Sequence, residues 1–463
     1  MEATMDKALS QETLGTKTLQ DQMSNEVSSD EDEAQDSEHE SFETKLSKAV
    51  IRRDTALVSS LMKGAEENEL EALAKNTKLM DETLDCLNDE DLKFIDKLYM
   101  HVEDLDVLTK CFFYRFGVNL GATSDEGKEF KRYFMYGTWP DVNGGNIKDD
   151  QGNDAIFDLE APWSVVGVKT VYKAIQGLPP SHIAQVKDII RRSTPYLNNI
   201  GGGAVAHYGT YYVQYYDEDA DSNSAGYCEG PADRCYELPA LERTIVHELA
   251  HIIDKDQLYS GRDEFRAITG WVDEGKNSDS AKIVDFIEAN ASGALYEGVV
   301  DDEDKSIARL AAELLVENST GYALNSYESN GVAQVKDRIK EAYYYIPDAK
   351  ADPEIKAEAM QNSFIFKFIV SSKSSNSNVP CYRGLMPLMN RQIHQGYEGG
   401  AWYSFPNKAF DDKISLYQLR DPGEEFAELY STYHVAAPKG SKTSAVHNDW
   451  FEKTGLHEDP QKT

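Results

Sequence analysis

The segment "RTIVHELAHIID", residues 243–254, constrains this chain more than any other. Two histidines stand four residues apart, and a glutamate directly follows the first of them. At about 100° per residue of α-helix, His247 and His251 lie about 40° apart on one face, with Glu248 at its flank. The opposite side is apolar and comprises Val246, Leu249, Ile252 and Ile253. We therefore predict a helix, beginning at Pro239 and ending near Gly261, that turns two imidazoles and a carboxylate toward a cleft.

Zinc is the metal that this arrangement favours, because it binds two neutral imidazole nitrogens one helical turn apart and leaves a carboxylate beside the attacking water. We predict Zn²⁺ as the cofactor, His247 and His251 as metal ligands, and Glu248 as the catalytic base. A motif with three fixed residues in five arises by chance in roughly one chain in a hundred of this length, so the motif alone does not establish a zinc site. A zinc site also requires a third protein ligand. Asp254 falls on the same face, where it either orients a ligand or is an exposed polar residue near the helix end.

The third ligand has to come from another part of the chain. The residues after His251 are "IIDKDQ", with Asp254 where a metzincin has glycine and Gln257 where it has histidine. Zinc sites without that continuation most often take a glutamate from a later helix.

The best source of such a glutamate is "YQLRDPGEEFAELYSTY", residues 417–433. Asp421 and Pro422 are typical of the start of a helix. Glu424 and Glu428 then share one face, which allows one of them to bind zinc and the other to steady a ligand histidine. The local pattern supports equally well a capping-box role for Glu424, which stands three residues after Asp421.

At these residues the chain resembles the lethal-factor-like gluzincin metallopeptidases, a group that includes the anthrax lethal-factor and proline-proline endopeptidase catalytic domains. Tyr417 stands seven residues before Glu424, the segment 421–428 is similar to theirs, and so is "FRAITGW" at 265–271. The resemblance covers about 165–275 and 400–435. It implies that Glu424 is the third zinc ligand, that Glu428 supports a ligand histidine, and that Tyr417 is a catalytic donor to the developing oxyanion.

The 463 residues divide into three predicted parts. Residues 1–41 are polar and include "SSDEDEAQDSEHE", which predicts a disordered acidic tail. Apolar residues at spacings of three and four predict a small all-helical N-terminal domain over 42–135. After a turn-rich linker, residues 155–463 are predicted to form an α+β, zincin-like metallopeptidase domain, in which a small mixed sheet accompanies the active-site helix.

Two further expectations concern the predicted metallopeptidase domain. His251 and Glu424 are 173 positions apart, and helical stretches between them predict a helical insertion at about 276–375. The aromatic run "TYYVQYY" (210–216) predicts a strand. In zincins an extended substrate commonly pairs with an edge strand beside the active helix, so this run is expected either to be that edge strand or to belong to the core.

Other polar clusters give weaker indications. His207, His394 and His434 are more consistent with surface or packed histidines than with ligands. The acidic loop 217–226 lacks the glycine and terminal glutamate positions of a calcium loop. Cys228 and Cys235 are close enough in sequence to pair in an oxidising setting, and the other cysteines are expected to be buried thiols.

The formal net charge of -34 disfavours nucleic acid and anionic lipid, and we expect a protein or peptide partner. No apolar run reaches membrane-span length, so no membrane span is predicted. The start of the chain lacks the basic and apolar regions of a Sec signal peptide. We therefore expect export by a route without a cleaved signal, or else a cytoplasmic location. The sequence does not determine the oligomeric state.

Together these patterns predict a zinc-dependent endopeptidase that hydrolyses a peptide bond of a protein substrate with metal-activated water. The polar start of the chain and the toxins and secreted peptidases of the resembled group favour an exported bacterial effector or toxin. Three alternatives are a housekeeping cytosolic metallopeptidase, a non-catalytic zinc-binding interaction protein on a zincin scaffold, and an acidic scaffold in which the motif is incidental. The second of these has no need of the base Glu248.

Overall fold

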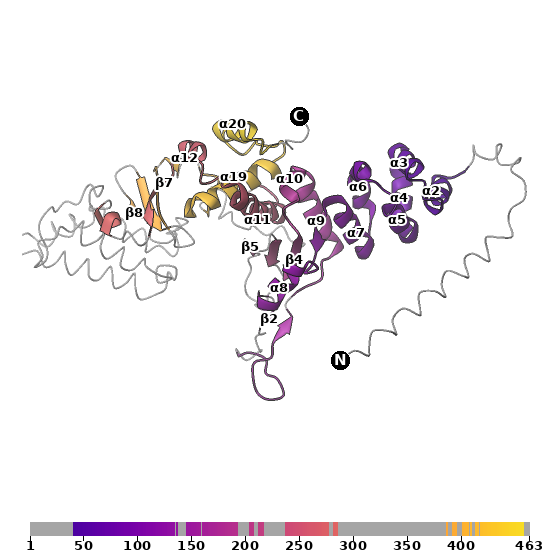
Figure 1. Cartoon of the computed structure of the whole chain (residues 1–463), viewed down its shortest axis with the longest axis horizontal. Coiled ribbons are helices and arrows are strands. Elements are labelled where there is room, and N and C mark those ends of the chain that lie inside the picture. The colour runs from indigo at the N-terminus through magenta and orange to yellow at the C-terminus, as the bar shows by residue number, and fades with distance from the viewer. Residues whose placement is uncertain are drawn as a thin grey trace, which may run out of the picture. The chain divides into compact units, whose positions relative to one another are not determined.

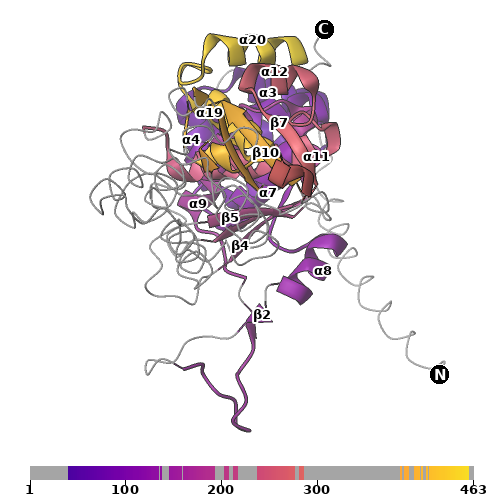
Figure 2. The same ribbon diagram turned by 90° about the vertical axis from the view of Figure 1, so that its left-hand side faces the viewer.

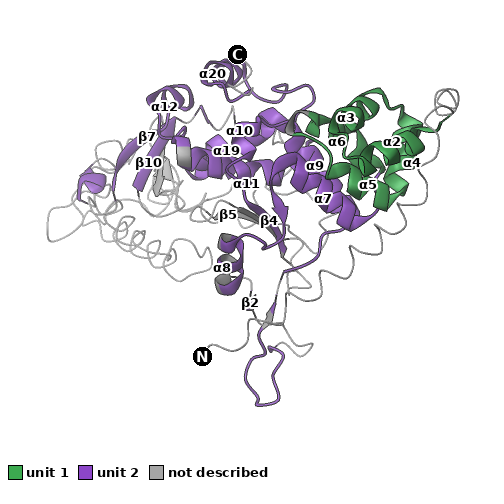
Figure 3. Ribbon diagram, turned by 45° about the vertical axis from the view of Figure 1, so that its right-hand side comes forward, with its two compact units in different colours: residues 1–101 green, residues 102–463 purple. Residues whose placement is uncertain are grey.

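The structure is a computed structural model, which divides the chain into two compact units, residues 1–101 and 102–463 (Figure 3). The residues that it describes are 40–134, 136–137, 145–158, 160–192, 203–207, 212–216, 237–276, 281–285, 386–387, 391–395, 401–406, 408–409, 413–415 and 417–457. The predictions for the acidic tail, for the loop 217–226, for the pairing of Cys228 with Cys235 and for most of the insertion fall outside the described residues.

The first unit is built from short helices with polar caps. They are α2 (Phe42–Ile51), α3 (Thr55–Gly64), α4 (Glu67–Lys75), α5 (Thr77–Leu84), η1 (Asp89–Phe94), α6 (Ile95–Leu98) and η2 (Tyr99–His101). Ser41, Asp54 and Asn76 cap α2, α3 and α5, because each side chain accepts a backbone N–H of the first turn. The buried core includes Leu46, Val58, Met62, Leu73, Met80, Leu84 and Ile95. The helical periodicity of this part of the sequence thus corresponds to a helical unit.

The second unit begins well before residue 135, the predicted end of the N-terminal domain. Helix α7 (Leu105–Phe116) packs on α9 (Val165–Gln176), and the Phe116 and Tyr172 ring centres are 4.8 Å apart. Strand β1 (Asn119–Leu120) pairs in parallel with β4 (Asp188–Arg192). Helical periodicity shows that α7 has an apolar face but not which core that face joins, and the contact with α9 decides the boundary.

The first sheet of this unit has the order β1-β4-β6-β5. Strand β6 (Tyr212–Tyr216) lies parallel to β4 and antiparallel to β5 (Gly203–His207), so the sheet is mixed, as predicted. Of the two alternatives for the aromatic run 210–216, the edge strand is wrong, since among the described strands β6 is an interior strand and β5 lies at the edge. Strand order depends on pairing between distant segments, which the local pattern does not contain.

Helix α11 (Ala240–Gln257) packs against β5 and β6 and also against α19 (Pro422–Val435), as Figure 1 shows. Helices α12 (Asp263–Thr269) and α20 (Ala445–Thr454) contact each other near α19 (Figure 2). An aromatic core joins α12, α19 and α20 to the turn after α11 through Phe265, Phe426, Trp450 and Tyr259. The second unit also contains α8 (Asp125–Phe134), β2 (Tyr136–Gly137) and β3 (Phe157–Asp158), of which β2 contacts both of the others, and α10 (Pro180–Ile183), which contacts α11.

A second sheet, entirely antiparallel, follows α12. Its order is β7-β10-β9-β8, with β7 at Val272–Lys276, β8 at Met386–Pro387, β9 at Arg391–Gln395 and β10 at Ala401–Pro406. Trp271, Phe405 and Leu419 form its buried cluster. The described chain is therefore a mixture of helices and small sheets, in agreement with the predicted class. None of the helices in the described ranges is long and apolar enough to cross a membrane.

Candidate metal centre

Helix α11 supplies the first half of the site. It begins after Pro239, as predicted, and ends at Gln257, where Leu258 takes a left-handed conformation with φ 51° and closes the helix before Gly261. Both sides of the helix are buried, because the apolar side packs on the sheet and the side with His247 and His251 faces α19. The polar residues of that second side are therefore enclosed between two helices.

Helix α19 supplies the second half. Asp421 is its N-cap, and the Asp421 Oδ1 accepts the backbone N–H of Glu424 at 2.9 Å, with Pro422 in the first turn. The carboxylate of Glu424 contacts the two histidines of α11. Of the two roles that the sequence left open for Glu424, the structure therefore favours that of a metal ligand over that of a capping-box partner.

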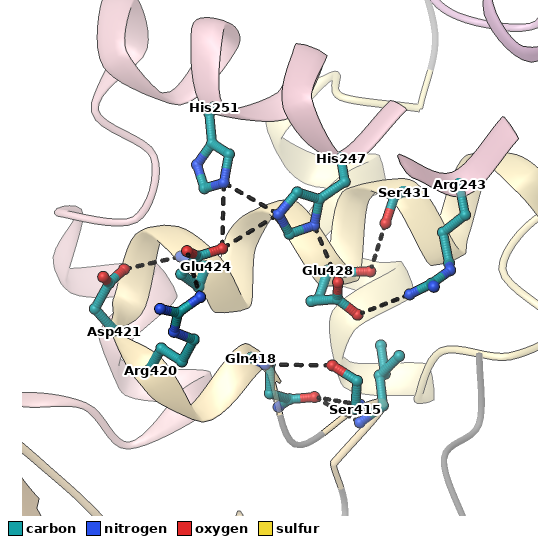
Figure 4. Close-up of polar contacts among 11 residues, drawn as sticks. Arg243, His247, His251, Ser415, Gln418, Arg420, Asp421, Glu424, Glu428 and Ser431 are labelled. Atoms are coloured by element: carbon teal, nitrogen blue, oxygen red, sulfur yellow. Dashed lines mark hydrogen bonds and ion pairs between the residues drawn. The ribbon is translucent and has the colours of Figure 1, made fainter. Parts of the chain in front are cut away.

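Three potential ligand atoms meet between the helices (Figure 4). The Glu424 Oε2 lies 3.2 Å from the His247 Nε2 and 3.3 Å from the His251 Nε2, and the two nitrogens are 3.1 Å apart. Ligand atoms at about 2.0–2.1 Å from a tetrahedral zinc ion are roughly 3.3–3.4 Å from one another. The triangle therefore has nearly the size that a zinc site requires, and this buried cluster can hold a metal ion.

The electrostatics of the triangle favour positive charge. Burial works to lower the pKa of His247, but hydrogen bonds to Glu424 and Glu428 outweigh burial and raise it to about 10. Burial also works against the charged form of His251, yet the hydrogen bond and the charge of Glu424 raise its pKa. Conversely, burial works to raise the pKa of Glu424, and the two histidines lower it instead. A proton or a divalent cation supplies the charge that this arrangement stabilises.

Glu428 supports His247 from the side opposite the triangle. Its Oε1 lies 3.0 Å from the His247 Nδ1, and its Oε2 lies 3.5 Å from the Arg243 Nη1. Burial acts to raise the pKa of Glu428, whereas His247 and Arg243 lower it. A carboxylate at Nδ1 fixes the ring orientation and leaves Nε2 directed at the metal position. Arg243 stands one turn before His247 on the same face, but its pairing with Glu428 is a contact between distant segments that the local sequence pattern does not contain.

Three other predicted residues lie close to this cluster. Glu248 is buried on α11, and its charge contributes to the raised pKa of both histidines. The Tyr417 ring centre is 5.7 Å from that of His247. Asp254 is buried, not exposed, and burial raises its pKa. Its oxygens accept the backbone N–H and the hydroxyl of Ser260 at 2.7 and 2.5 Å, so it closes the turn after α11.

Arg420 and Glu425 are polar residues near the site to which the sequence patterns assigned no role. Tyr417 belongs to the short helix η5 (Tyr417–Arg420), and the Arg420 Cζ lies 4.4 Å from the Tyr417 ring centre. The Arg420 Nη1 is 3.9 Å from the Glu424 Oε1, the oxygen that the histidines leave free. Glu425 is turned to Trp271 and Gln418, and burial raises its pKa to about 8.

Of the three other histidines considered from the sequence, His434 has a described side chain, and it lies outside the triangle. The His434 Nε2 faces the Leu456 carbonyl oxygen at 3.0 Å, and its ring centre lies 4.4 Å from that of Tyr430, so it is a packed histidine. His207 and His394 lie in β5 and β9, and their side chains are outside the description.

Comparison of the chain with protein-family models, with curated proteins and with solved structures finds no match. The function of the site is therefore argued from its own geometry, and the resemblance to lethal-factor-like metallopeptidases stays a prediction.

Proposed function

We propose that this protein is a zinc-dependent endopeptidase in which His247, His251 and Glu424 bind the metal. One observation carries the proposal: three ligand atoms 3.1 to 3.3 Å apart, on two helices, with the acid Glu248 directly after the first histidine. Two imidazoles and one carboxylate are the ligand set of several catalytic zinc sites. A bound zinc ion would lower the pKa of a coordinated water and polarise the scissile carbonyl.

The chain's own residues provide the proton transfers and the positioning. The Glu248 carboxylate accepts the proton of the attacking water and donates it to the leaving amine, as a general base and then a general acid. Glu428 keeps the His247 Nε2 available by accepting from its Nδ1–H. The Tyr417 hydroxyl donates a hydrogen bond to the oxyanion that forms on the substrate carbonyl.

We propose that an extended peptide substrate binds along β5. This strand is the edge of the described sheet beside α11, and its inner side pairs with β6. An extended peptide can add to such an edge through main-chain hydrogen bonds, and this places its carbonyl groups along the active helix. The proposal that the protein is an exported effector or toxin rests on the sequence pattern alone.

Metal analysis and digestion of a peptide library, applied to the same preparations, test the proposal. The wild-type protein is expected to bind one zinc ion and to cleave peptides. Glu248→Ala should keep zinc and lose roughly three orders of magnitude of cleavage, because it removes only the base. Glu424→Gln should lose most of its zinc, whereas Glu452→Gln, at an exposed position of α20, should retain zinc and activity.

Each other outcome has a definite meaning. Zinc without cleavage in the wild type would support the non-catalytic zinc-binding alternative. Neither zinc nor cleavage would mean that the motif is incidental. If Glu248→Ala kept activity within tenfold of wild type, the assignment of the base would be refuted.

A further inference from the structure

Glu425 directly follows the metal-site glutamate, yet its carboxylate has a different set of partners. One oxygen accepts the indole N–H of Trp271, and the other accepts the Gln418 Nε2–H at 2.9 Å. Glu425 is 3% exposed, and both of these donors are neutral. A carboxylate is expensive to bury, so its two oxygens are strongly constrained to keep these donors.

Gln418 uses the rest of its amide to shape the segment that precedes it. Its Oε1 accepts the backbone N–H groups of Ile414 at 2.5 Å and Ser415 at 3.2 Å. Its own backbone N–H donates to the Ser415 Oγ at 3.3 Å. The segment 414–418 is thereby closed on itself and tied to α19 through one side-chain pair, as Figure 4 shows for Gln418 and Ser415.

The same pair reaches the second sheet. Trp271 precedes β7, and it packs with Phe405 of β10 and with Leu419 of η5. Glu425 thus joins α19, η5 and the second sheet at one point. Tyr417, beside Gln418 in the sequence, makes an edge-to-face contact with the His247 ring, with the ring centres 5.7 Å apart.

We propose that Gln418 and Glu425 are a positioning pair, which sets where the Tyr417 hydroxyl lies relative to the metal site. Neither side chain touches the ligand triangle directly, and the neighbour of Gln418 that contacts a ligand ring is Tyr417, whose ring centre lies 5.7 Å from that of His247; we therefore assign the effect of the pair to Tyr417. The catalytic consequence rests on the proposed endopeptidase function, while the structural part concerns the segment 413–420 alone. A displacement of about 1 Å in a catalytic group can cost roughly 10²-fold in rate.

An exchange of the two side chains tests the pair in the full-length protein. Gln418→Glu alone replaces the amide donor by a second acid, so the Glu425 oxygen keeps its partner only if the two acids share a proton; the exchange is therefore measured above the raised pKa of Glu425, where both are ionised. Glu425→Gln alone sets two amide NH₂ groups against each other, since Trp271 needs the remaining oxygen. The double substitution restores every hydrogen bond: the carboxylate at 418 accepts from the backbone and from the amide at 425, whose oxygen accepts from Trp271. Rescue also separates a local role from a general loss of folding, because a misfolded single variant is expected to recover in the double.

Two readouts are measured on wild type, both single variants and the double variant. Hydrogen exchange of the Ile414 and Ser415 amides should be at least about tenfold faster in the singles and return to the wild-type rate in the double. The kcat for a peptide substrate should fall by about 10- to 100-fold in the singles, with zinc content unchanged, and should also be restored in the double. In a Tyr417→Phe background, adding Glu425→Gln should lower kcat by less than a further threefold, because the pair acts through the Tyr417 hydroxyl.

The proposal is overturned if the singles exchange at the wild-type rate, or if the double is no better than the singles. It is also overturned if Glu425→Gln costs as much kcat in the Tyr417→Phe background as in wild type. If the wild type cleaves no peptide, the endopeptidase proposal fails. The hydrogen-exchange rates of the Ile414 and Ser415 amides then decide alone whether the pair positions the segment.

Discussion

Replacing Glu428 by leucine should separate the stability of the site from its affinity for zinc. Glu428 is completely buried, with His247 Nδ1 at 3.0 Å and Arg243 Nη1 at 3.5 Å from its two oxygens. Leucine has a similar volume, so the main loss is electrostatic: the guanidinium of Arg243 remains buried without its carboxylate. Breaking a buried pair from one side typically costs about 3–5 kcal/mol, and we expect that loss in the free energy of unfolding of Glu428→Leu.

The matched double variant also removes the positive charge of Arg243. Arg243→Met combined with Glu428→Leu replaces the pair by apolar groups of similar size, which is often close to neutral, so most of the lost stability should return. Zinc affinity should stay lowered by about 10- to 100-fold in both variants, because His247 lacks its orienting carboxylate in each of them. Stability and metal affinity should therefore respond differently to the second substitution.

Urea unfolding of chelator-treated protein, followed by tryptophan fluorescence, measures the first quantity. All five tryptophans lie beyond residue 101, so the signal reports on the second unit. Competition with a chromogenic chelator measures zinc affinity. A loss of less than about 1 kcal/mol in Glu428→Leu, or a double variant no more stable than the single, would refute the account of a buried ion pair.

Three further predictions concern Arg420, pH and the domain boundary. Arg420→Gln should weaken zinc binding by roughly tenfold in the chelator competition, because the Glu424 carboxylate loses the guanidinium that orients it, and this loss is expected to outweigh the relief of charge repulsion on the metal; unchanged affinity would remove Arg420 from the site. In metal-free protein, the raised pKa of His247 contributes stability that is complete below 6.5 and lost as pH rises toward about 10, so urea midpoints should fall over that range, and less so in His247→Gln. The lowered pKa of Glu424 acts in the other direction, since its contribution is present above 4.5 and is lost in acid. A chain shortened to begin at Val102 should keep its zinc and its folded second unit. A chain that begins near residue 150 should aggregate, because it lacks α7 and β1. Much faster cleavage of short peptides by the Val102 chain than by the full chain would indicate that the first unit restrains the site.

Much of the local structure around the site was predictable from the sequence. The spacing of His247 and His251 on an amphipathic helix requires only the 3.6-residue period, and Asp421–Pro422 is a local start signal. The helix beginnings at Pro239 and Asp421, the shared face of Glu424 and Glu428, and the helical character of residues 42–118 all depend on neighbours within one or two turns. These are the features in which prediction and structure agree.

The tertiary structure decided what depends on contacts between distant segments. It brought the Glu424 carboxylate to the two histidines by packing α19 against α11, although His251 and Glu424 are 173 positions apart in the sequence. It moved α7 from the predicted N-terminal domain into the second unit, and it placed β6 inside the sheet and β5 at its edge. The buried partners of Arg243, Gln418 and Glu425 were decided in the same way. Periodicity and caps are properties of neighbouring residues, whereas the partner of a buried charge is decided by which surfaces pack together to remove apolar area from water.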